Sequence, residues 1–338
     1  MGHVLLQPIT ADRPCGDNLE DTPLLASFDT FRLFGESTPP DARLDPRDHE
    51  GKRLLPPPEW GEIKNRALEA LGKSKDLRLL AYFGTASLWT DGLPAFADTL
   101  TIASQWLETY WTDTYPLVDE DAILRRNALN CFADQMAVLD GLRRLPLVAS
   151  RRHGTFGLRD IDITTGQLQP ADSDVRPDEA QINAAFAEMR LDDLAGLRQS
   201  VADALAALKS IGAAMTARGG PDAVPEFDPL SLLLARLGRV LGAQLALRPD
   251  GGGAEASGSD STSAGAMAVG AIKSRQDAIR ALDAVAEFFR RNEPSSPIPL
   301  FLERAKRLVS KNFLEVLADV APEAVPQARA AGGLAQSE

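Results

Sequence analysis

The feature that most constrains this fold lies near the C-terminus, where prolines separate two strongly amphipathic helical patterns. Residues 274–300 read Ser-Arg-Gln-Asp-Ala-Ile-Arg-Ala-Leu-Asp-Ala-Val-Ala-Glu-Phe-Phe-Arg-Arg-Asn-Glu-Pro-Ser-Ser-Pro-Ile-Pro-Leu. Ser274 is a suitable N-cap, and Pro294 disfavours helical geometry in the residue before it. Between them, apolar residues recur at three- and four-residue steps on one face: Ile279, Leu282, Ala286 and Phe289. The run therefore predicts an amphipathic helix that ends at Pro294.

A second helix is predicted directly after this break. Ser296 can cap its N-terminus and Pro297 occupies the first helical position, where proline is favoured. Its apolar stripe consists of Leu300, Phe301, Ala305, Leu308 and Val309. A third short helix can begin at Asn312, so the sequence predicts a helical region over residues 272–325.

A region of about fifty residues is too small to bury the apolar surface of three helices well without disulfides, metal or partners. The missing burial can come from other copies of the chain, or from a cap packed on the chain itself. For self-assembly we expect these packing residues: Leu282, Phe288, Phe289, Ile298, Leu300, Phe301 and Phe313. Arg290, Arg291 and Glu293 are expected to be polar contacts of the same interface.

A change of composition separates this region from the rest of the chain. Residues 249–271 are mostly Gly, Ser, Ala and Asp, which predicts a flexible linker. A linker of this length spans about 25 Å on average, enough for the last region to assemble apart from the preceding domains.

Composition limits the classes of partner. The chain has 338 residues and a net charge of -12, which disfavours nucleic acid because binding depends on Lys and Arg that neutralise phosphates. Two cysteines, Cys15 and Cys131, cannot build a disulfide framework, and no Cys and His spacing matches a zinc site. No apolar run reaches the length of a membrane span or a signal peptide. We expect a cytoplasmic protein without membrane insertion.

The N-terminal part predicts a mainly α fold with a small β-hairpin at its end. Helical periodicity and Gly or Pro breaks predict helices over residues 60–72, 74–92, 94–110 and 120–142. Two short strands follow at 145–148 and 155–163, and Gly166 marks a turn. We assign residues 1–166 to this domain.

Residues 175–248 predict a middle helical hairpin. Two interleaved sets of apolar residues repeat every seven positions: Leu194, Val201, Leu208 and Met215, with Leu197, Ala204 and Ile211. The helix breaks at Gly219-Gly220-Pro221, and a second apolar helix follows. The heptad seam is either an antiparallel contact within one chain or a contact between chains.

No catalytic, cofactor or metal site is predicted. Gly265, Gly270 and Lys273 imitate a phosphate-binding loop, but the lysine does not directly follow the second glycine. Asp160 and Asp162 alternate on the expected strand, as solvated strand residues often do. The three histidines are scattered, and no Ser or Cys nucleophile has a visible base. A hydrolase whose site combines residues distant in sequence stays an alternative.

Four aromatic residues gather in one stretch: Trp106, Tyr110, Trp111 and Tyr115. Large aromatic side chains dominate interface hot spots, so the cluster is a candidate surface for binding a partner. Core packing is the competing interpretation and the more frequent one for such clusters.

Two blocks of sequence resemble one family. The run 274–300, with Arg304-Ala305 beyond it, is similar to the C-terminal region of the TssA (ImpA) family of type VI secretion system components. The N-terminal block is similar to that family's opening domain through Pro14, Gly16, Asp17, Leu19, Glu59-Trp60, 74–78, 91–93 and the aromatic stretch 106–116. The short C-terminal block looks like that of members likened to phage baseplate parts.

The resemblance implies a non-enzymatic scaffold. It implies that the C-terminal region forms a ring-like homo-oligomer and that the N-terminal domain recruits baseplate, tube or contractile sheath proteins. The alternative is a helical adaptor that works as a monomer or dimer. The native mass separates the two, because only the scaffold predicts a high-order ring.

Overall fold

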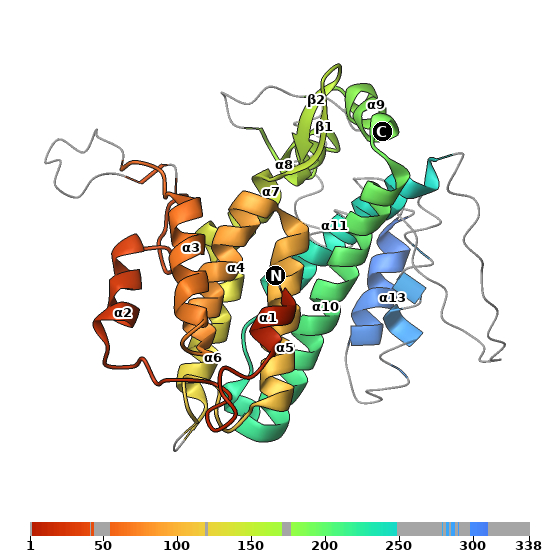
Figure 1. Cartoon of the computed structure of the whole chain (residues 1–338). Helices are drawn as coiled ribbons and strands as arrows, with labels where there is room; N and C mark the ends of the chain where they lie inside the picture. The colour runs from red at the N-terminus through yellow and green to blue at the C-terminus, as the bar shows by residue number, and fades with distance from the viewer. Residues whose placement is uncertain are drawn as a thin grey trace, which may run out of the picture. The chain divides into compact units, whose positions relative to one another are not determined.

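A computed structural model describes residues 2–40, 42–43, 55–118, 121–170 and 177–248, and in the C-terminal part residues 279, 282–283, 285–287, 290 and 298–309. The chain forms two compact units, Met1–Glu255 and Ala256–Glu338. Among the described residues, helices dominate and the only sheet has two strands, which confirms the predicted mainly α class (Figure 1).

The first unit is built around one helix that is buried on nearly every side. This helix is α4, which spans Leu77–Asp91. It follows α1 (Gly2–Leu6), α2 (Pro23–Ala26), the 3-10 turn η1 (Ser27–Phe31) and α3 (Trp60–Leu71). Residues Leu79 to Leu88 of α4 are all buried. The Asp76 carboxylate accepts a hydrogen bond from the Arg78 N–H and caps α4. A core therefore surrounds α4.

Glycine sets the turn into the next helix. Gly92 has φ of 84°, a left-handed geometry that glycine adopts without a Cβ clash, and its N–H bonds the carbonyls of Ser87 and Leu88. Helix α5 (Leu93–Thr109) follows directly. The predicted break at Asp91-Gly92 is confirmed.

The prediction of one continuous helix over residues 120–142 is wrong. The described chain forms α6 (Ile123–Asn130), a 3-10 turn η2 (Cys131–Ala133), a π-helical turn η3 (Gln135–Leu139) and α7 (Asp140–Arg144). Asp134 leaves helical geometry at ψ of 133°, and its carboxylate accepts hydrogen bonds from the N–H groups of Met136 and Ala137. It acts as an N-cap inside the predicted helix and restarts the chain in a new direction.

The hairpin is confirmed, but its second strand is shorter than predicted. Strand β1 (Pro146–Ser150) pairs antiparallel with β2 (Gly154–Gly157), and helix α8 (Leu158–Thr164) begins immediately. The Asp160 carboxylate accepts a hydrogen bond from the Gly157 N–H at 2.8 Å, and this contact caps the helix. Asp160 and Asp162 therefore lie on a helix and do not alternate along a strand.

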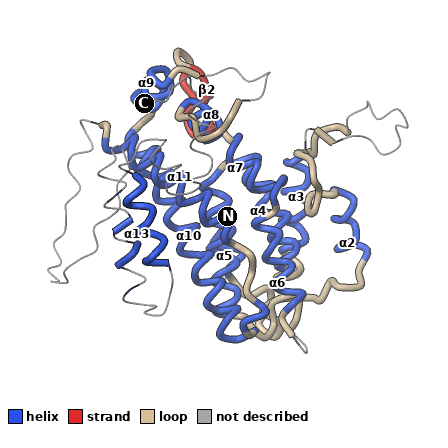
Figure 2. Tube along the Cα trace, turned by 180° about the vertical axis from the view of Figure 1, so that it is seen from behind, coloured by secondary structure: helices blue, strands red, loops and turns tan. Residues whose placement is uncertain are grey.

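Helix α9 (Glu179–Glu188) leads into the long helix α10 (Leu191–Gly219), the turn η4 (Pro221–Ala223) and α11 (Asp228–Ala246). Gly220, with φ of 89°, reverses the chain. Helix α10 packs against both α5 and α11, and the three lie side by side in both views (Figures 1 and 2). Six of the seven heptad residues are buried there: Leu194, Val201, Ala204, Leu208, Ile211 and Met215. The heptad seam is therefore a contact within one chain. The two predicted domains, residues 1–166 and 175–248, belong to the same compact unit.

In the second unit the structure describes α13 (Ile298–Val309) and several helical residues before it. Arg290 pairs with Glu303 at 3.0 Å, and Lys306 pairs with Asp283. These ion pairs hold the earlier helical residues alongside α13. The linker 249–271 and the predicted break at Pro294 lie outside the described residues, as does the helix expected from Asn312.

Candidate functional site

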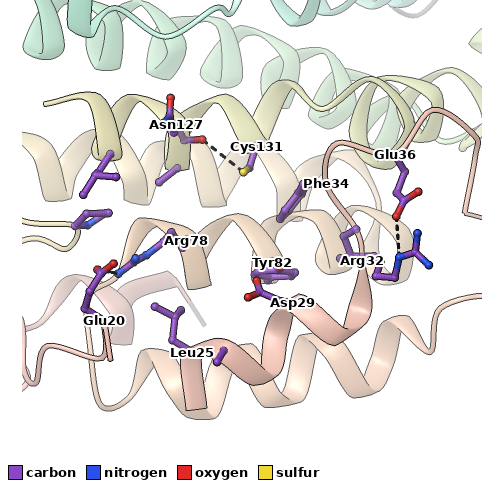
Figure 3. A pocket seen from close by; sticks show the side chains of 15 residues that line it. Glu20, Leu25, Asp29, Arg32, Phe34, Glu36, Arg78, Tyr82, Asn127 and Cys131 are labelled. Atoms are coloured by element: carbon purple, nitrogen blue, oxygen red, sulfur yellow. Dashed lines mark hydrogen bonds and ion pairs between the residues drawn. The ribbon is translucent and has the colours of Figure 1, made fainter. Parts of the chain in front are cut away.

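A cleft of about 660 Å³ opens in the first unit between η1, α4 and α6 (Figure 3). Its walls come from three stretches that are distant in sequence, residues 20–36, 78–82 and 116–131. About half of the lining residues are apolar: Leu25, Ala26, Leu33, Phe34, Pro116, Leu124, Ala128 and Cys131. The rest include the charged residues Glu20, Asp29, Arg32, Glu36 and Arg78. A cavity that combines apolar walls with placed polar groups is the usual form of a specific binding site.

Tyr82 lies at the centre of this cleft. It projects from the buried helix α4, is 8% exposed, and packs its ring 5.1 Å from the Phe28 ring and 4.9 Å from the Phe34 ring. Burial raises the pKa of the Tyr82 phenol, and the nearby Asp29 carboxylate raises it further. No described residue forms a hydrogen bond with the hydroxyl. The cleft thus contains a protonated phenol that is free to bind another molecule.

The two arginines of the cleft are already paired. Arg78 contacts Glu20 and Asp76, each at 2.7 Å, and Arg32 contacts Glu36 at 3.1 Å. Burial alone would lower the pKa of Arg78, but its hydrogen bonds to Asp76 and Glu20 raise it, and the bond to Arg78 lowers the pKa of Glu20. Asp29 has no ion pair or hydrogen bond from a described side chain. The cleft is therefore acidic, with one unpaired carboxylate.

Neither cysteine has the surroundings of a nucleophile. Cys131 lines the cleft, and burial raises its pKa to about 12, so the thiol is protonated at neutral pH. Cys15 is buried beside Thr114, with 3.8 Å between Sγ and Oγ1, and burial raises its pKa as well. Among the described residues, no three His, Cys, Asp or Glu side chains gather as a metal site would require.

The aromatic cluster contacts its own chain. Trp106 is fully buried, and its Nε1 donates to the Leu5 carbonyl at 2.9 Å. The hydroxyl of Tyr110 donates to the Leu6 carbonyl at 3.2 Å. The Leu5 carbonyl also accepts a hydrogen bond from buried Lys75 Nζ at 2.6 Å, and burial lowers the pKa of this lysine. These contacts attach the first helix to α5.

The other two aromatic residues belong to the segment after α5. The guanidinium groups of Arg125 and Arg218 lie 4.6 and 5.6 Å from the centre of the Trp111 ring. The Tyr115 hydroxyl donates to the Gly16 carbonyl at 3.3 Å. Partner binding by the four aromatic residues stays a prediction, and Trp106 has no exposed surface in this structure.

The predicted assembly residues are only partly described. Leu300 and Phe301 lie on α13 and are 75% and 68% exposed, whereas Leu282 and Ile298 are half-buried. Arg290 is exposed and pairs with Glu303 and Glu287. Phe288, Phe289, Arg291, Glu293 and Phe313 lie outside the residues whose side chains are described.

Sequence reasoning did not find the cleft. Its lining comes from three separate stretches, and Tyr82 lay within an ordinary helical pattern. The available signal was weak: several charged residues around an apolar run at residues 20–36. None of the helices in the described part of the chain combines the length and the apolar character needed to cross a membrane.

Comparison with known proteins gives concordant results. Residues 6–134 match the family described as ImpA, N-terminal, type VI secretion system. The chain is 33% identical over 345 aligned positions to the type VI secretion system component TssA1 of Pseudomonas aeruginosa, and the alignment covers 96% of each protein. A solved N-terminal domain of the TssA component from Burkholderia cenocepacia has the same fold, with a TM-score of 0.53 and 21% identity over 72% of this chain and 93% of that one.

Proposed function

The chain belongs to the TssA family of type VI secretion system components, and we propose that it is an assembly scaffold of that system. In this proposal residues 272–325 form a ring-like homo-oligomer. Residues 1–248 are presented to baseplate, tube and contractile sheath proteins, and the linker 249–271 separates the two parts. The scaffold acts in the cytoplasm and needs no cofactor.

One observation carries the self-assembly part. Leu300 and Phe301 are neighbours on α13, and both are largely exposed in a single copy of the chain. By helical spacing Phe301 lies roughly opposite Glu303 and Lys306, which pair with the preceding helical residues, whereas Leu300 lies one turn before Glu303 on its side of the helix. Fully burying a leucine or phenylalanine side chain gains about 1.5–3 kcal/mol, so this face gains stability when another copy covers it.

The polar side of α13 supports the same arrangement. The ion pairs Arg290–Glu303 and Lys306–Asp283 fix α13 against its own chain through charged groups. Its apolar residues Leu300 and Phe301 are thereby left available for a contact between chains. Val285, 42% exposed on the preceding helical stretch, adds to the apolar surface of this unit.

The test is complementation in a bacterium that produces this secretion system. Cells lacking the chain should assemble few contractile sheaths, counted by fluorescence of a labelled sheath protein, and the wild-type chain should restore them. Phe301→Asp should fail to restore assembly. Leu232→Asp is the matched control, because Leu232 is 71% exposed but lies on α11 in the first unit.

Two outcomes would contradict this function. Sheath counts that do not change when the chain is deleted would remove the scaffold role. Full restoration by Phe301→Asp would remove the role of the α13 face and favour an adaptor that works as a monomer or dimer.

A further inference from the structure

We propose that the cleft between η1, α4 and α6 binds a segment of another secretion component that presents an arginine beside an aliphatic residue. This inference rests on the proposed scaffold function and adds to it the chemistry of one recruited partner. It begins from two residues that line the cleft, Tyr82 and Asp29, both labelled in Figure 3.

Both groups lack partners among the described residues. Tyr82 is 8% exposed, and its hydroxyl is reached by water in the cleft, since it is not among the buried polar atoms that lack a partner in the described part of the chain. Asp29 is exposed and lines the same cleft as Tyr82. A phenol and a carboxylate that converge on one space are suited to a ligand with several N–H donors.

The charges of the lining favour a cationic ligand. Glu20, Asp29 and Glu36 line the cleft with only Arg32 and Arg78, and Arg78 is shared between Glu20 and the buried Asp76. These four carboxylates and two guanidinium groups leave two negative charges, and Asp29 is the carboxylate without a described partner. A guanidinium pairs with a carboxylate through two parallel hydrogen bonds, and it packs well against aromatic faces. Phe34 and Tyr82 provide such faces.

The surface around the cleft favours a protein segment over a small molecule. Leu124 lines the cleft and is 58% exposed, and two further apolar residues flank the lining: Leu117, next to Pro116, is 45% exposed and Ile123, next to Leu124, is 39% exposed. A small ligand inside the cavity would leave these side chains in water. A segment with an aliphatic residue beside its arginine covers them while the arginine enters the cleft.

The charge of the lining favours a basic segment as the occupant. Carboxylates outnumber arginines in the cleft, whereas this chain has a net charge of -12 and is a poor source of basic segments. A basic segment of a different protein is attracted to the cleft. This attraction weakens as salt rises, because Asp29 is exposed.

Photo-crosslinking in cells that produce the secretion system tests this proposal. The full-length chain carries p-benzoylphenylalanine in place of Leu124, and the crosslinked peptide is sequenced by mass spectrometry. We expect a peptide from another component of the secretion system with an arginine or lysine close to the crosslinked residue. Asp29→Lys should lower the crosslink yield at least fivefold, and Asp29→Asn, which nearly preserves the shape, should lower it as well.

Asp98→Lys is the matched control, because Asp98 is exposed on α5 and does not line the cleft. This variant should leave the yield unchanged. A synthetic peptide with the crosslinked sequence should bind the purified wild-type chain at least tenfold more tightly than the Asp29→Lys chain. Replacing the arginine of the peptide with glutamate should restore binding to the Asp29→Lys chain.

The proposal is overturned if the crosslink forms only to another copy of this chain or if no crosslink forms. It is equally overturned if the Asp29 substitutions leave the crosslink yield unchanged. It is also overturned if a small molecule is found to occupy the cleft in place of a peptide. Light scattering separates these outcomes from a failure of the scaffold function. The Asp29 variants should keep the oligomeric mass of the wild type, whereas a wild-type chain that stays a single copy would contradict the scaffold and not the cleft.

Discussion

Arg125 lies with its guanidinium 4.6 Å from the ring centre of Trp111 and donates a hydrogen bond to the Trp111 carbonyl at 3.0 Å. The same side chain donates to the carbonyls of Thr114 at 2.5 Å and Pro116 at 2.9 Å, and it is fully buried. One planar cation thus holds the segment between α5 and α6, whose Pro116 lines the cleft. The shape of the cleft therefore depends on a residue that does not line it.

Arg125→Lys should lower the free energy of unfolding by about 3 kcal/mol, because an ammonium cannot reach all three carbonyls and leaves buried acceptors unpaired. Arg126→Lys is the control: Arg126 donates to the Asp222 carbonyl through an exposed contact and should cost less than about 1 kcal/mol. Urea unfolding followed by circular dichroism measures both. Equal effects of the two substitutions would contradict the assigned role of Arg125.

Asp134 should behave as the cap that divides the predicted helix 120–142. Its carboxylate accepts hydrogen bonds from Met136, Ala137 and Gly35, so Asp134→Ala should destabilise the fold by about 1–2 kcal/mol. Asp134→Asn keeps one acceptor oxygen and should recover most of that loss. An alanine variant as stable as the wild type in chemical denaturation would show that the cap is unimportant.

Glu20 should make a pH-dependent contribution to stability. Its hydrogen bond to Arg78 lowers its pKa in the folded state below the ordinary 4.5. The unfolded state therefore binds more protons in this range, and the contribution is complete above pH 4.5 and is lost as the pH falls through the folded pKa. Glu20→Gln should thus cost more stability at pH 7 than at pH 3, measured by urea unfolding at both values. A cost independent of pH would contradict the ion pair.

Much of the helical fold could be predicted because its signals are local. Gly92 ends α4, Gly220 ends α10, and six of the seven heptad residues of α10 are buried as their spacing indicates. The predicted length of the second strand was wrong for an identifiable reason. Ile161 and Ile163 alternate with Asp160 and Asp162, but Leu158 and Ile161 are also buried at helical spacing on α8. A segment this short fits both periods, and the Asp160 cap favours the helix.

The cleft could not be predicted by the same means. Asp29, Tyr82 and Leu124 come from three elements that are distant in sequence, and the residues around each of them do not indicate that all three line one cleft. The aromatic cluster presents a related difficulty. Aromatic residues are common both in protein cores and in interfaces, so the sequence does not show which role each of them has. Contacts within the chain, such as the buried Lys75 Nζ 5.0 Å from the centre of the Trp106 ring, show that the fold itself uses part of that cluster.

Self-assembly through the exposed face of α13 makes a direct prediction about one substitution. Phe301→Asp places a charge at a position that another copy should cover, so the oligomer should become smaller or dissociate without unfolding the first unit. Circular dichroism should show the helical content of the wild type, and Leu232→Asp should leave the mass unchanged. A change of mass in the Leu232 variant equal to that of the Phe301 variant would point to a general effect of surface charge.

The most direct test of the scaffold is the mass of the purified full-length chain, measured by light scattering over a range of concentrations. One copy has a mass of 36.3 kDa. We predict a discrete species many times heavier than one copy, reduced by Phe301→Asp. A well-folded chain that stays at 36.3 kDa at the highest concentration would contradict the ring and the function assigned to its C-terminal region.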